Sequence, residues 1–265
     1  MKKKFTILGC GSSIGSPWIT NFWGNLDKTN KKNIRTRCCA HIQYNNLSIL
    51  LDTSPDIKQQ LLKNKIKNVD SVIYTHEHSD QTSGIFELRP FYWKNKKKIS
   101  IFGSKKTINI LKEKYDFCFK KKYDYKPIMN AKIIKNNFTI KKELTALKIK
   151  SLEVQHGLIK STAYIFKKVA YVSDCNNIEE KNLKHFKNLN YLIIDCLRLT
   201  KHNSHLNLDQ SLFLISKLKP KKAILTNLHT DLDYEKLKKI LPKNVIPAFD
   251  GYHFVNVQGV RISIS

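Results

Sequence analysis

The chain has 265 residues, of which 41% are hydrophobic, so it is long enough to bury a sizeable core. Its 48 lysines and arginines exceed its 21 aspartates and glutamates, and the formal net charge of +27 favours phosphate-bearing partners. No stretch reaches about 18 uninterrupted apolar residues, and the basic start turns glycine- and serine-rich, so we expect neither a membrane span nor a signal peptide.

The positive charge has two readings. The lysines are spread along the chain, which is typical of a solvated surface, while a dedicated nucleic-acid face is the alternative. The six cysteines contain no C-x-x-C pair. We therefore expect reduced thiols and a cytoplasmic protein without disulfides.

Short apolar runs separated by turn residues predict strands in the order 5–8, 48–51, 72–74, 99–102, 147–154, 163–166, 169–172, 191–194 and 223–225. Helical periodicity is present at residues 56–65, 208–218 and 234–240. The first half is rich in strands and the second half closes with strand–helix units. This order favours a mixed sheet covered by helices, with residues 1–265 forming one domain.

Several predicted strands end in a histidine or an aspartate. These residues are His76, His156, Asp174, Asp195 and His229. A single histidine in such a place is usually structural, but five similar strand ends predict that their side chains share one rim.

The residue types at this rim indicate a metal site. Imidazole and carboxylate without thiolate suit zinc, manganese or iron. His76, His78 and Asp80 alternate, so an extended segment directs them to one side, and a following turn divides them between two ions. Two neighbouring ions activate water and stabilise charge on a phosphoryl or carbonyl oxygen, which predicts a hydrolase.

The segment THEHSDQTSGI resembles the H-x-H-x-D-H signature of the metallo-β-lactamase superfamily. His156, Asp174 and His229 follow in the order that this superfamily uses, and the likeness runs from GCGSSIGSP to LHTDLDYE. It is greatest to the branch of the phosphoribosyl 1,2-cyclic phosphate phosphodiesterase, with tRNA 3′-end nucleases as more distant relatives. The resemblance implies an α/β fold, a four-layer αββα sandwich of two mixed sheets flanked by helices.

The resemblance also implies two divalent ions, manganese or zinc. The first would be held by His76, His78 and His156, and a water or hydroxide between the ions would be the nucleophile. Asp174 would bridge to the second ion, held by Asp80 and His229.

His205 matches a histidine that acts as a proton donor beside the phosphate in the phosphodiesterase relatives, so His205 and Asp80 are the expected catalytic residues. His202 is the competing candidate, and it is also a candidate for substrate binding. We prefer His205 because Asn207-Leu208-Asp209 starts a helix in the manner of the family motif.

The chain departs from the family pattern in two places. Gln81 stands where a further histidine is usual, and an amide is a weaker ligand, so the second ion should bind less tightly. Around residues 24–27 the chain lacks the cysteines that hold a structural zinc in the phosphodiesterase relatives, and we predict none.

Other residues support alternatives. Arg198 and Asp195 either line the substrate pocket or make structural contacts. Arg89 either orients the metal loop or pairs with Glu87, and Asp52 is a candidate to hold a ligating histidine by its other nitrogen. The turn at residues 9–13 offers backbone N–H groups to an anion, and His41, His185 and His253 are interpreted as structural.

A phosphodiesterase for a small cyclic phosphate or phosphodiester is the function we favour, with a nuclease second and a thioester or lactone hydrolase third. A metal-poor binding protein is the alternative outside enzymes. The expected partner is therefore a small phosphodiester, with nucleic acid second and no membrane. Relatives imply a homodimer, and no segment identifies its interface.

Overall fold

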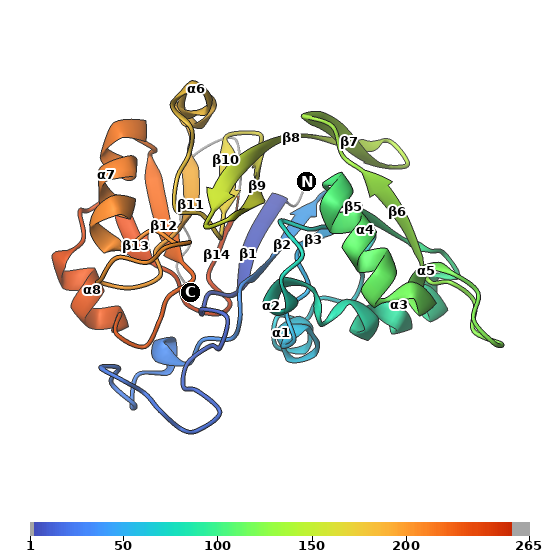
Figure 1. Cartoon of the computed structure of the whole chain (residues 1–265), viewed down its shortest axis with the longest axis horizontal. Coiled ribbons are helices and arrows are strands. Elements are labelled where there is room, and N and C mark those ends of the chain that lie inside the picture. Colours follow the sequence, from blue (N-terminus) through green and yellow to red (C-terminus); the bar gives the residue numbers. More distant parts are fainter. Residues whose placement is uncertain (1–2, 256–265) are drawn as a thin grey trace.

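The computed structural model describes residues 3–255, and it contains two seven-stranded sheets that lie face to face with helices on their outer faces (Figure 1). The first sheet has the order β14 (His253–Val255), β1 (Lys3–Gly9), β2 (Cys39–Tyr44), β3 (Leu47–Leu51), β4 (Ser71–Ile73), β5 (Ile99–Gly103) and β6 (Met129–Ile133). The second has the order β13 (Val245–Pro247), β12 (Lys222–Thr226), β11 (Tyr191–Asp195), β10 (Val169–Val172), β9 (Ile159–Phe166), β8 (Thr145–His156) and β7 (Asn137–Lys142). The predicted αββα sandwich is confirmed.

Both sheets are mixed. Strands β3 to β6 run parallel, as do β10 to β13, whereas the remaining neighbours are antiparallel. Because parallel strands end at the same edge of a sheet, β10, β11 and β12 deliver the residues that follow them to one place. This geometry explains why the polar strand ends share a rim.

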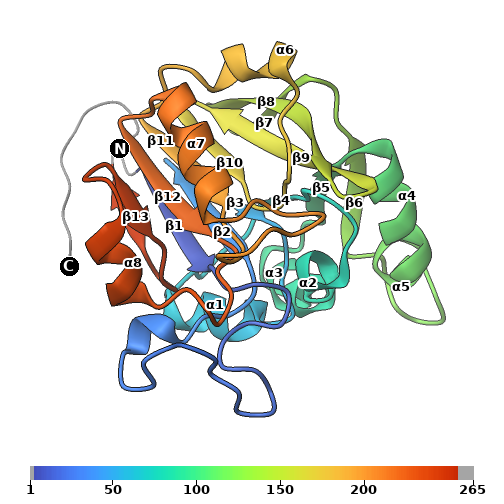
Figure 2. The same cartoon turned by 60° about the vertical axis from the view of Figure 1, so that its left-hand side comes forward.

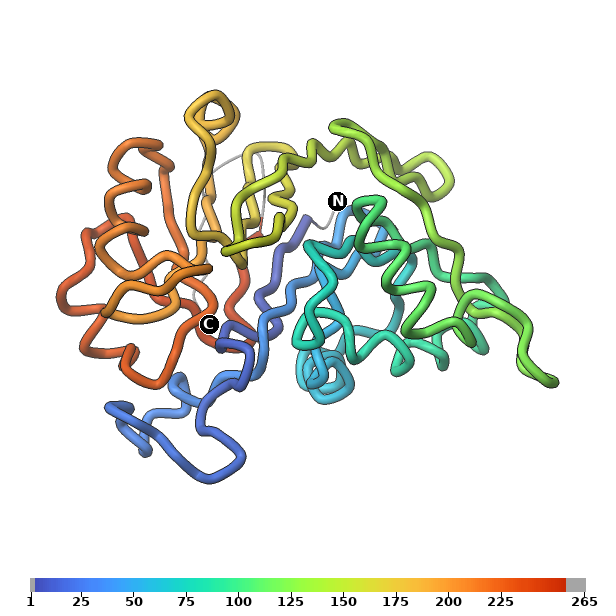
Figure 3. The backbone as a smooth tube through the Cα atoms, in the orientation of Figure 1, coloured from blue at the N-terminus to red at the C-terminus, as the bar shows by residue number. Residues whose placement is uncertain are grey.

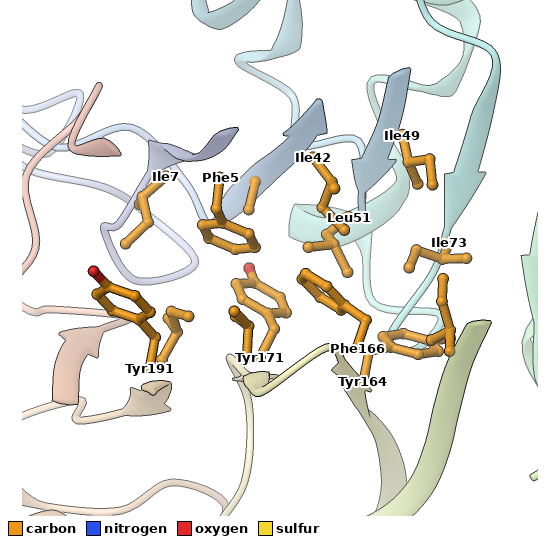
Figure 4. Close-up of a cluster of buried hydrophobic side chains, with 14 of the residues drawn as sticks. Phe5, Ile7, Ile42, Ile49, Leu51, Ile73, Tyr164, Phe166, Tyr171 and Tyr191 are labelled. Atoms are coloured by element: carbon orange, nitrogen blue, oxygen red, sulfur yellow. The ribbon is translucent and has the colours of Figure 1, made fainter. Parts of the chain in front are cut away.

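Three apolar clusters hold the layers together. The central cluster lies between the sheets, and it includes Phe5 and Ile42 from the first sheet and Tyr164 and Tyr171 from the second (Figure 4). The outer faces of the sheets bury two further clusters under the helices. Strands buried on both faces explain the continuous apolar runs in the sequence.

Helices α1 (Ile57–Lys63), α3 (Arg89–Asn95), α4 (Lys105–Lys114) and α5 (Asp116–Phe119) accompany the first sheet, and α6 (Glu180–Leu183), α7 (Leu208–Leu218) and α8 (Tyr234–Ile240) accompany the second (Figure 2). Short turns of helix lie at η1 (Lys31–Asn33), α2 (Ser79–Thr82), η2 (Ile85–Leu88) and η3 (Lys184–Phe186). The side chain of Asn207 accepts from the backbone of Gln210 and starts α7 with a capping box.

The predicted strands and the three predicted helices are present, although β4 ends at Ile73, one residue early. Sequence reasoning missed β2, β6, β7, β13 and β14, and also α3 to α6. Strands β6 and β7 lie at sheet edges and carry exposed lysines and asparagines, so they lack the apolar signal of central strands.

The single domain predicted over residues 1–265 includes residues 1, 2 and 256–265, which lie outside the described residues. All six cysteines are buried and free. None of the helices between residues 3 and 255 is long and apolar enough to cross a membrane.

The segment between β1 and β2 makes a long excursion beside the sheets (Figure 3). It is attached to the loop before α8, because Asp233 accepts hydrogen bonds from the Asp27 backbone at 3.0 Å and from the Asn33 amide at 2.6 Å. This attachment holds the excursion close to the residues that follow β12.

Candidate metal centre and active site

Three histidines from distant parts of the chain come together. His76 and His78 follow β4, and His156 is the last residue of β8. Their ring centroids lie 4.5 Å, 4.9 Å and 5.1 Å apart, and one nitrogen of each ring lies within 4.8 Å of the other two. Three imidazole nitrogens at this spacing could hold one divalent ion.

The protein orients two of these rings through their second nitrogen. Nδ1 of His156 donates to the carbonyl oxygen of Ser204 at 2.8 Å. Nδ1 of His76 lies 3.0 Å from the Thr75 hydroxyl, which itself donates to Asp52 at 2.9 Å. Since the hydroxyl proton goes to Asp52, its oxygen accepts the proton of His76. Both rings therefore leave Nε2 unprotonated, as a metal ligand requires.

The chemistry of the histidine group fits a metal ion. Nε2 of His76 is buried and has no hydrogen-bond partner among residues 3–255, which is unusual for a polar atom. Burial lowers the pKa of His76 to about 4 and also lowers the pKa of His156. Both side chains are thus neutral near pH 7, the form in which imidazole binds zinc or manganese.

Two carboxylates lie beside the histidines. An oxygen of Asp174 lies within 4.8 Å of ring nitrogens of His156 and His205. Burial opposes the ionisation of Asp174, but the surrounding histidines outweigh burial and lower its pKa. Burial and the charge of Asp174 raise the pKa of Asp80 to about 6. Carboxylate oxygens suit a divalent ion, and the role of Asp174 and Asp80 as ligands of a second ion stays a prediction.

Gln81 is fully buried between these carboxylates. Its side-chain nitrogen donates to Asp80 at 3.1 Å and lies 3.5 Å from Asp174, while its oxygen is buried without a partner in the described part of the chain. The sequence predicted a weak oxygen ligand at this position. The amide instead turns its nitrogen to the carboxylates, so a ligand role requires the opposite amide orientation.

His205 adjoins the histidine group and is held by a buried carboxylate. Its ring centroid lies 4.7 Å from that of His156, and its Nδ1 lies 2.7 Å from Asp195, which is completely buried. Burial opposes protonation of His205, but attraction to Asp195 outweighs burial and raises its pKa to about 9. A protonated imidazole beside the candidate metal centre could donate a proton, and the role of His205 as proton donor stays a prediction.

His229 lies at the rim, outside both groups of ligand atoms found among residues 3–255. Its Nδ1 is 3.4 Å from Asp231, and its ring lies edge-on to Trp18 with centroids 5.9 Å apart. The buried guanidinium of Arg35 donates to the carbonyl oxygen of His229 at 3.2 Å and to that of Leu232 at 2.6 Å. The role of His229 as a ligand stays a prediction.

Comparison with known families identifies the superfamily of the chain. The family described as the β-lactamase superfamily domain matches residues 48–227, and solved structures of the metallo-β-lactamase fold match almost the whole chain. The chain belongs to the metallo-β-lactamase superfamily. Its fold, its hydrolase neighbours and its histidine group support a metal-dependent hydrolase.

Solved metallo-β-lactamase structures differ in their likeness to the chain. A new diphosphatase from the PhnP family is 27% identical with a TM-score of 0.86, covering 97% of this chain and 98% of that one. Zinc-bound PqqB from Methylobacterium extorquens is 15% identical with a TM-score of 0.77, covering 95% and 99%. The short form of human tRNase Z is 15% identical with a TM-score of 0.67, covering 95% and 98%. The last two show the fold alone.

One curated relative is an octanoyltransferase of Porphyromonas gingivalis, which is 26% identical over 262 residues. The match covers 97% of this chain but 52% of that protein. The metallo-β-lactamase chain therefore spans about half the length of the relative.

Two residues predicted to bind substrate contact their own loop, and their role toward a substrate stays a prediction. Arg198 donates to the carbonyl oxygens of Thr200 at 3.3 Å and Lys201 at 2.7 Å. Nδ1 of His202 accepts from the backbone of Ser204 at 3.3 Å, and its ring lies 5.1 Å from that of His205. Both side chains brace the loop that carries His205.

Three weaker predictions need correction. The N–H groups of Cys10, Gly11 and Ser12 donate within the protein, to Asp250, Thr36 and Leu228, so the turn does not offer them to an anion. Asp52 reaches His76 through the Thr75 hydroxyl and not directly. Arg89 lies over the rings of Phe86 and Trp93, at 4.4 Å and 4.5 Å, and makes no ion pair with Glu87.

Sequence reasoning missed Asn227, which links the site residues. Its amide nitrogen lies 3.3 Å from Asp174, 3.4 Å from Asp195 and 3.1 Å from Nδ1 of His205. Asn227 follows β12 with φ 65°, in the left-handed region that asparagine tolerates better than most residues. Its place at the end of a strand is the signal that could have found it.

Proposed function

We propose that the protein hydrolyses a small cyclic phosphate or phosphodiester with the help of two divalent ions. The observation that carries the proposal is the proton donor His205, held by Asp195, beside the His76, His78 and His156 group. Cleavage of a phosphodiester leaves an alkoxide that needs a proton, and His205 supplies it.

The ligands follow from the atoms that face one another. His76 and His156 would offer Nε2, and His78 would offer Nδ1, which lies 3.4 Å from Nε2 of His156. Asp174 would be shared with a second ion, held by Asp80 and His229. Manganese or zinc bound there would polarise the phosphoryl oxygen and activate a water.

His205 carries a proton on both ring nitrogens near pH 7, because burial is outweighed by attraction to Asp195, which raises its pKa to about 9. Asp195 accepts the Nδ1 proton at 2.7 Å, which leaves the Nε2 proton for the substrate. Asp195 also accepts from the backbone of Cys175 at 2.9 Å, so the carboxylate is fixed before substrate binds. Such preorganisation places the proton where the leaving oxygen develops negative charge.

Hydrolysis of a diphosphate bridge is a second candidate. The 27% identical neighbour is called a diphosphatase, and both reactions break a P–O bond beside the same ions. The leaving group in this reaction is a phosphate, which is a weaker base than an alkoxide, so the reaction depends less on His205.

A substrate screen tests the proposal. Manganese- or zinc-loaded protein is given ribose cyclic phosphate, bis-p-nitrophenyl phosphate, ADP-ribose, a short RNA, a β-lactam and a thioester. We expect turnover of the phosphodiesters. Turnover of the β-lactam or thioester with none of the phosphate compounds contradicts the proposal, and cleavage of ADP-ribose alone favours the diphosphate bridge.

A further inference from the structure

A second pocket lies apart from the histidine group. It is formed by η2, the start of α3, α5 and the segment that follows α5, and its volume is about 290 Å³. It shares no lining residue with the candidate metal centre. The segment after α5 extends away from the sheets at one end of the molecule (Figures 1 and 3).

The pocket has an aromatic lining that is accessible to a ligand. Phe86, Phe117, Tyr123 and Tyr125 are 38%, 37%, 84% and 63% exposed. The rings of Phe86 and Phe117 meet edge to face, with centroids 5.3 Å apart. Four exposed aromatic side chains around one hollow offer flat surfaces on which another ring can stack.

Arg89 gives the pocket a fixed cation. Its guanidinium lies against the rings of Phe86 and Trp93 and forms no hydrogen bond or ion pair with the residues from 3 to 255. The two rings hold the guanidinium at the pocket, and its N–H groups have no partner among residues 3–255. This arrangement suits the paired oxygens of a phosphate.

Two lysines add positive charge at the same pocket. Lys122 and Lys126 belong to its lining, and Lys122 is paired with Asp116 at 3.1 Å. Reciprocal backbone hydrogen bonds between Lys122 and Tyr125, of 3.3 Å and 3.0 Å, close a tight turn that presents the aromatic and basic side chains together. The charge of this segment is complementary to an anion.

We propose that this pocket binds a nucleotide unit, with the base on the aromatic side chains and the phosphate on Arg89. Stacking on exposed rings together with a phosphate-binding cation is the combination used for bases of single strands. The nucleotide can be free or part of an RNA strand. The inference goes beyond the proposed hydrolysis, because the pocket and the metal centre have separate residues.

Binding to the full-length, metal-loaded protein tests the inference. Adenosine monophosphate, ribose 5-phosphate and a short fluorescent oligoadenylate are titrated and followed by calorimetry or fluorescence anisotropy. We expect adenosine monophosphate to bind more tightly than ribose 5-phosphate. Equal binding of the two overturns the proposal, because the base would then contribute nothing.

Substitutions locate the binding. Arg89→Gln and Tyr125→Leu should each weaken nucleotide binding about tenfold or more, whereas Tyr125→Phe should retain it. Lys148→Gln removes an exposed lysine of β8 and is the charge control. Tyr125 is itself exposed, so Tyr125→Leu keeps the test valid if Arg89→Gln disturbs folding.

Two further outcomes overturn the inference. Equal weakening by Lys148→Gln and Arg89→Gln indicates general charge attraction, and loss of binding in His76→Ala but not in Arg89→Gln places the nucleotide at the metal centre. Hydrolysis of bis-p-nitrophenyl phosphate should be unchanged in the pocket variants, so the two proposals can fail separately. Tighter binding of the oligoadenylate than of the monophosphate identifies RNA as the source, and equal binding identifies the free nucleotide.

Discussion

The carboxylate of Asp195 accepts a hydrogen bond from Nδ1 of His205 at 2.7 Å, although one residue ends a strand and the other lies in a loop. Asp195 is the last residue of β11, and His205 precedes α7. The contact distinguishes His205 from His202, which is held by its own loop. The proposed roles of these two histidines are therefore open to a direct test.

His205→Gln should lower kcat by about 10² to 10⁴ for a substrate with an alkoxide leaving group. The loss should be far smaller for bis-p-nitrophenyl phosphate, because p-nitrophenolate leaves without a proton. Steady-state rates with both substrates check the difference, and Asp195→Asn should follow the same pattern. His202→Gln is the control, and an equal loss at His202 would remove the ground for preferring His205.

Thr75→Val should weaken metal binding about 10- to 100-fold, because the hydroxyl that accepts from His76 is lost while the shape is kept. Thr75→Ser retains the hydroxyl and should bind normally. Competition with a chelating dye measures both affinities. Unchanged affinity in Thr75→Val would show that the link from Asp52 to His76 does not orient the ligand.

Gln81→His should increase the amount of metal bound at the second site, because imidazole replaces an amide whose nitrogen faces Asp80 and Asp174. Elemental analysis after reconstitution measures ions per chain, and the hydrolysis rate shows whether the added ion contributes. Gln81→Leu is the size-matched control without a ligand. The same metal content in wild type and Gln81→His contradicts a weakened second site.

His41 should make stability depend on pH. Its ring is buried against the Ser48 hydroxyl at 2.8 Å, and burial lowers its pKa to about 4. Because the unfolded pKa is higher, near 6.5, the stabilisation is complete above about pH 6.5 and is lost as pH falls toward 4, by at most about 1.4 kcal/mol per unit. Urea unfolding of wild type and His41→Gln at several pH values measures this loss. The difference in unfolding free energy between the two proteins should narrow as pH falls from about 6.5 to about 4. A difference in unfolding free energy that does not change with pH would contradict the lowered pKa of His41.

Arg35→Met should destabilise the fold by about 3 kcal/mol or more. Arg35 is 1% exposed, and its guanidinium donates to the oxygens of His229, Leu232 and Asn33, which would be left unpaired in the interior. Chemical unfolding gives the free energy of unfolding. Arg198→Gln is the matched control, because its contacts are exposed, and it should cost less than about 1 kcal/mol. Equal losses of unfolding free energy in the two variants would show that the buried contacts of Arg35 stabilise the fold no more than the exposed contacts of Arg198.

Local signals in the sequence determined much of the molecule. Helices α7 and α8 have the predicted bounds, because their apolar periodicity and the caps at Asn207 and Asp233 depend on residues within one or two turns. The placement of His76 and His78 on the same side was also predictable, since alternate side chains of an extended segment point to one side.

Only the tertiary structure determined which side chains of the site contact one another. The Thr75 link joins the ends of β3 and β4, the Asn227 contacts join residues at the ends of strands of the second sheet, and Gln81 reaches from the first sheet to Asp174 of the second. No local pattern encodes these contacts. The pocket around Arg89 likewise exists because η2 and the segment after α5 are brought together by the fold. Periodicity specifies which face of an element is buried, but the partners at the ends of strands depend on packing between elements far apart in the chain.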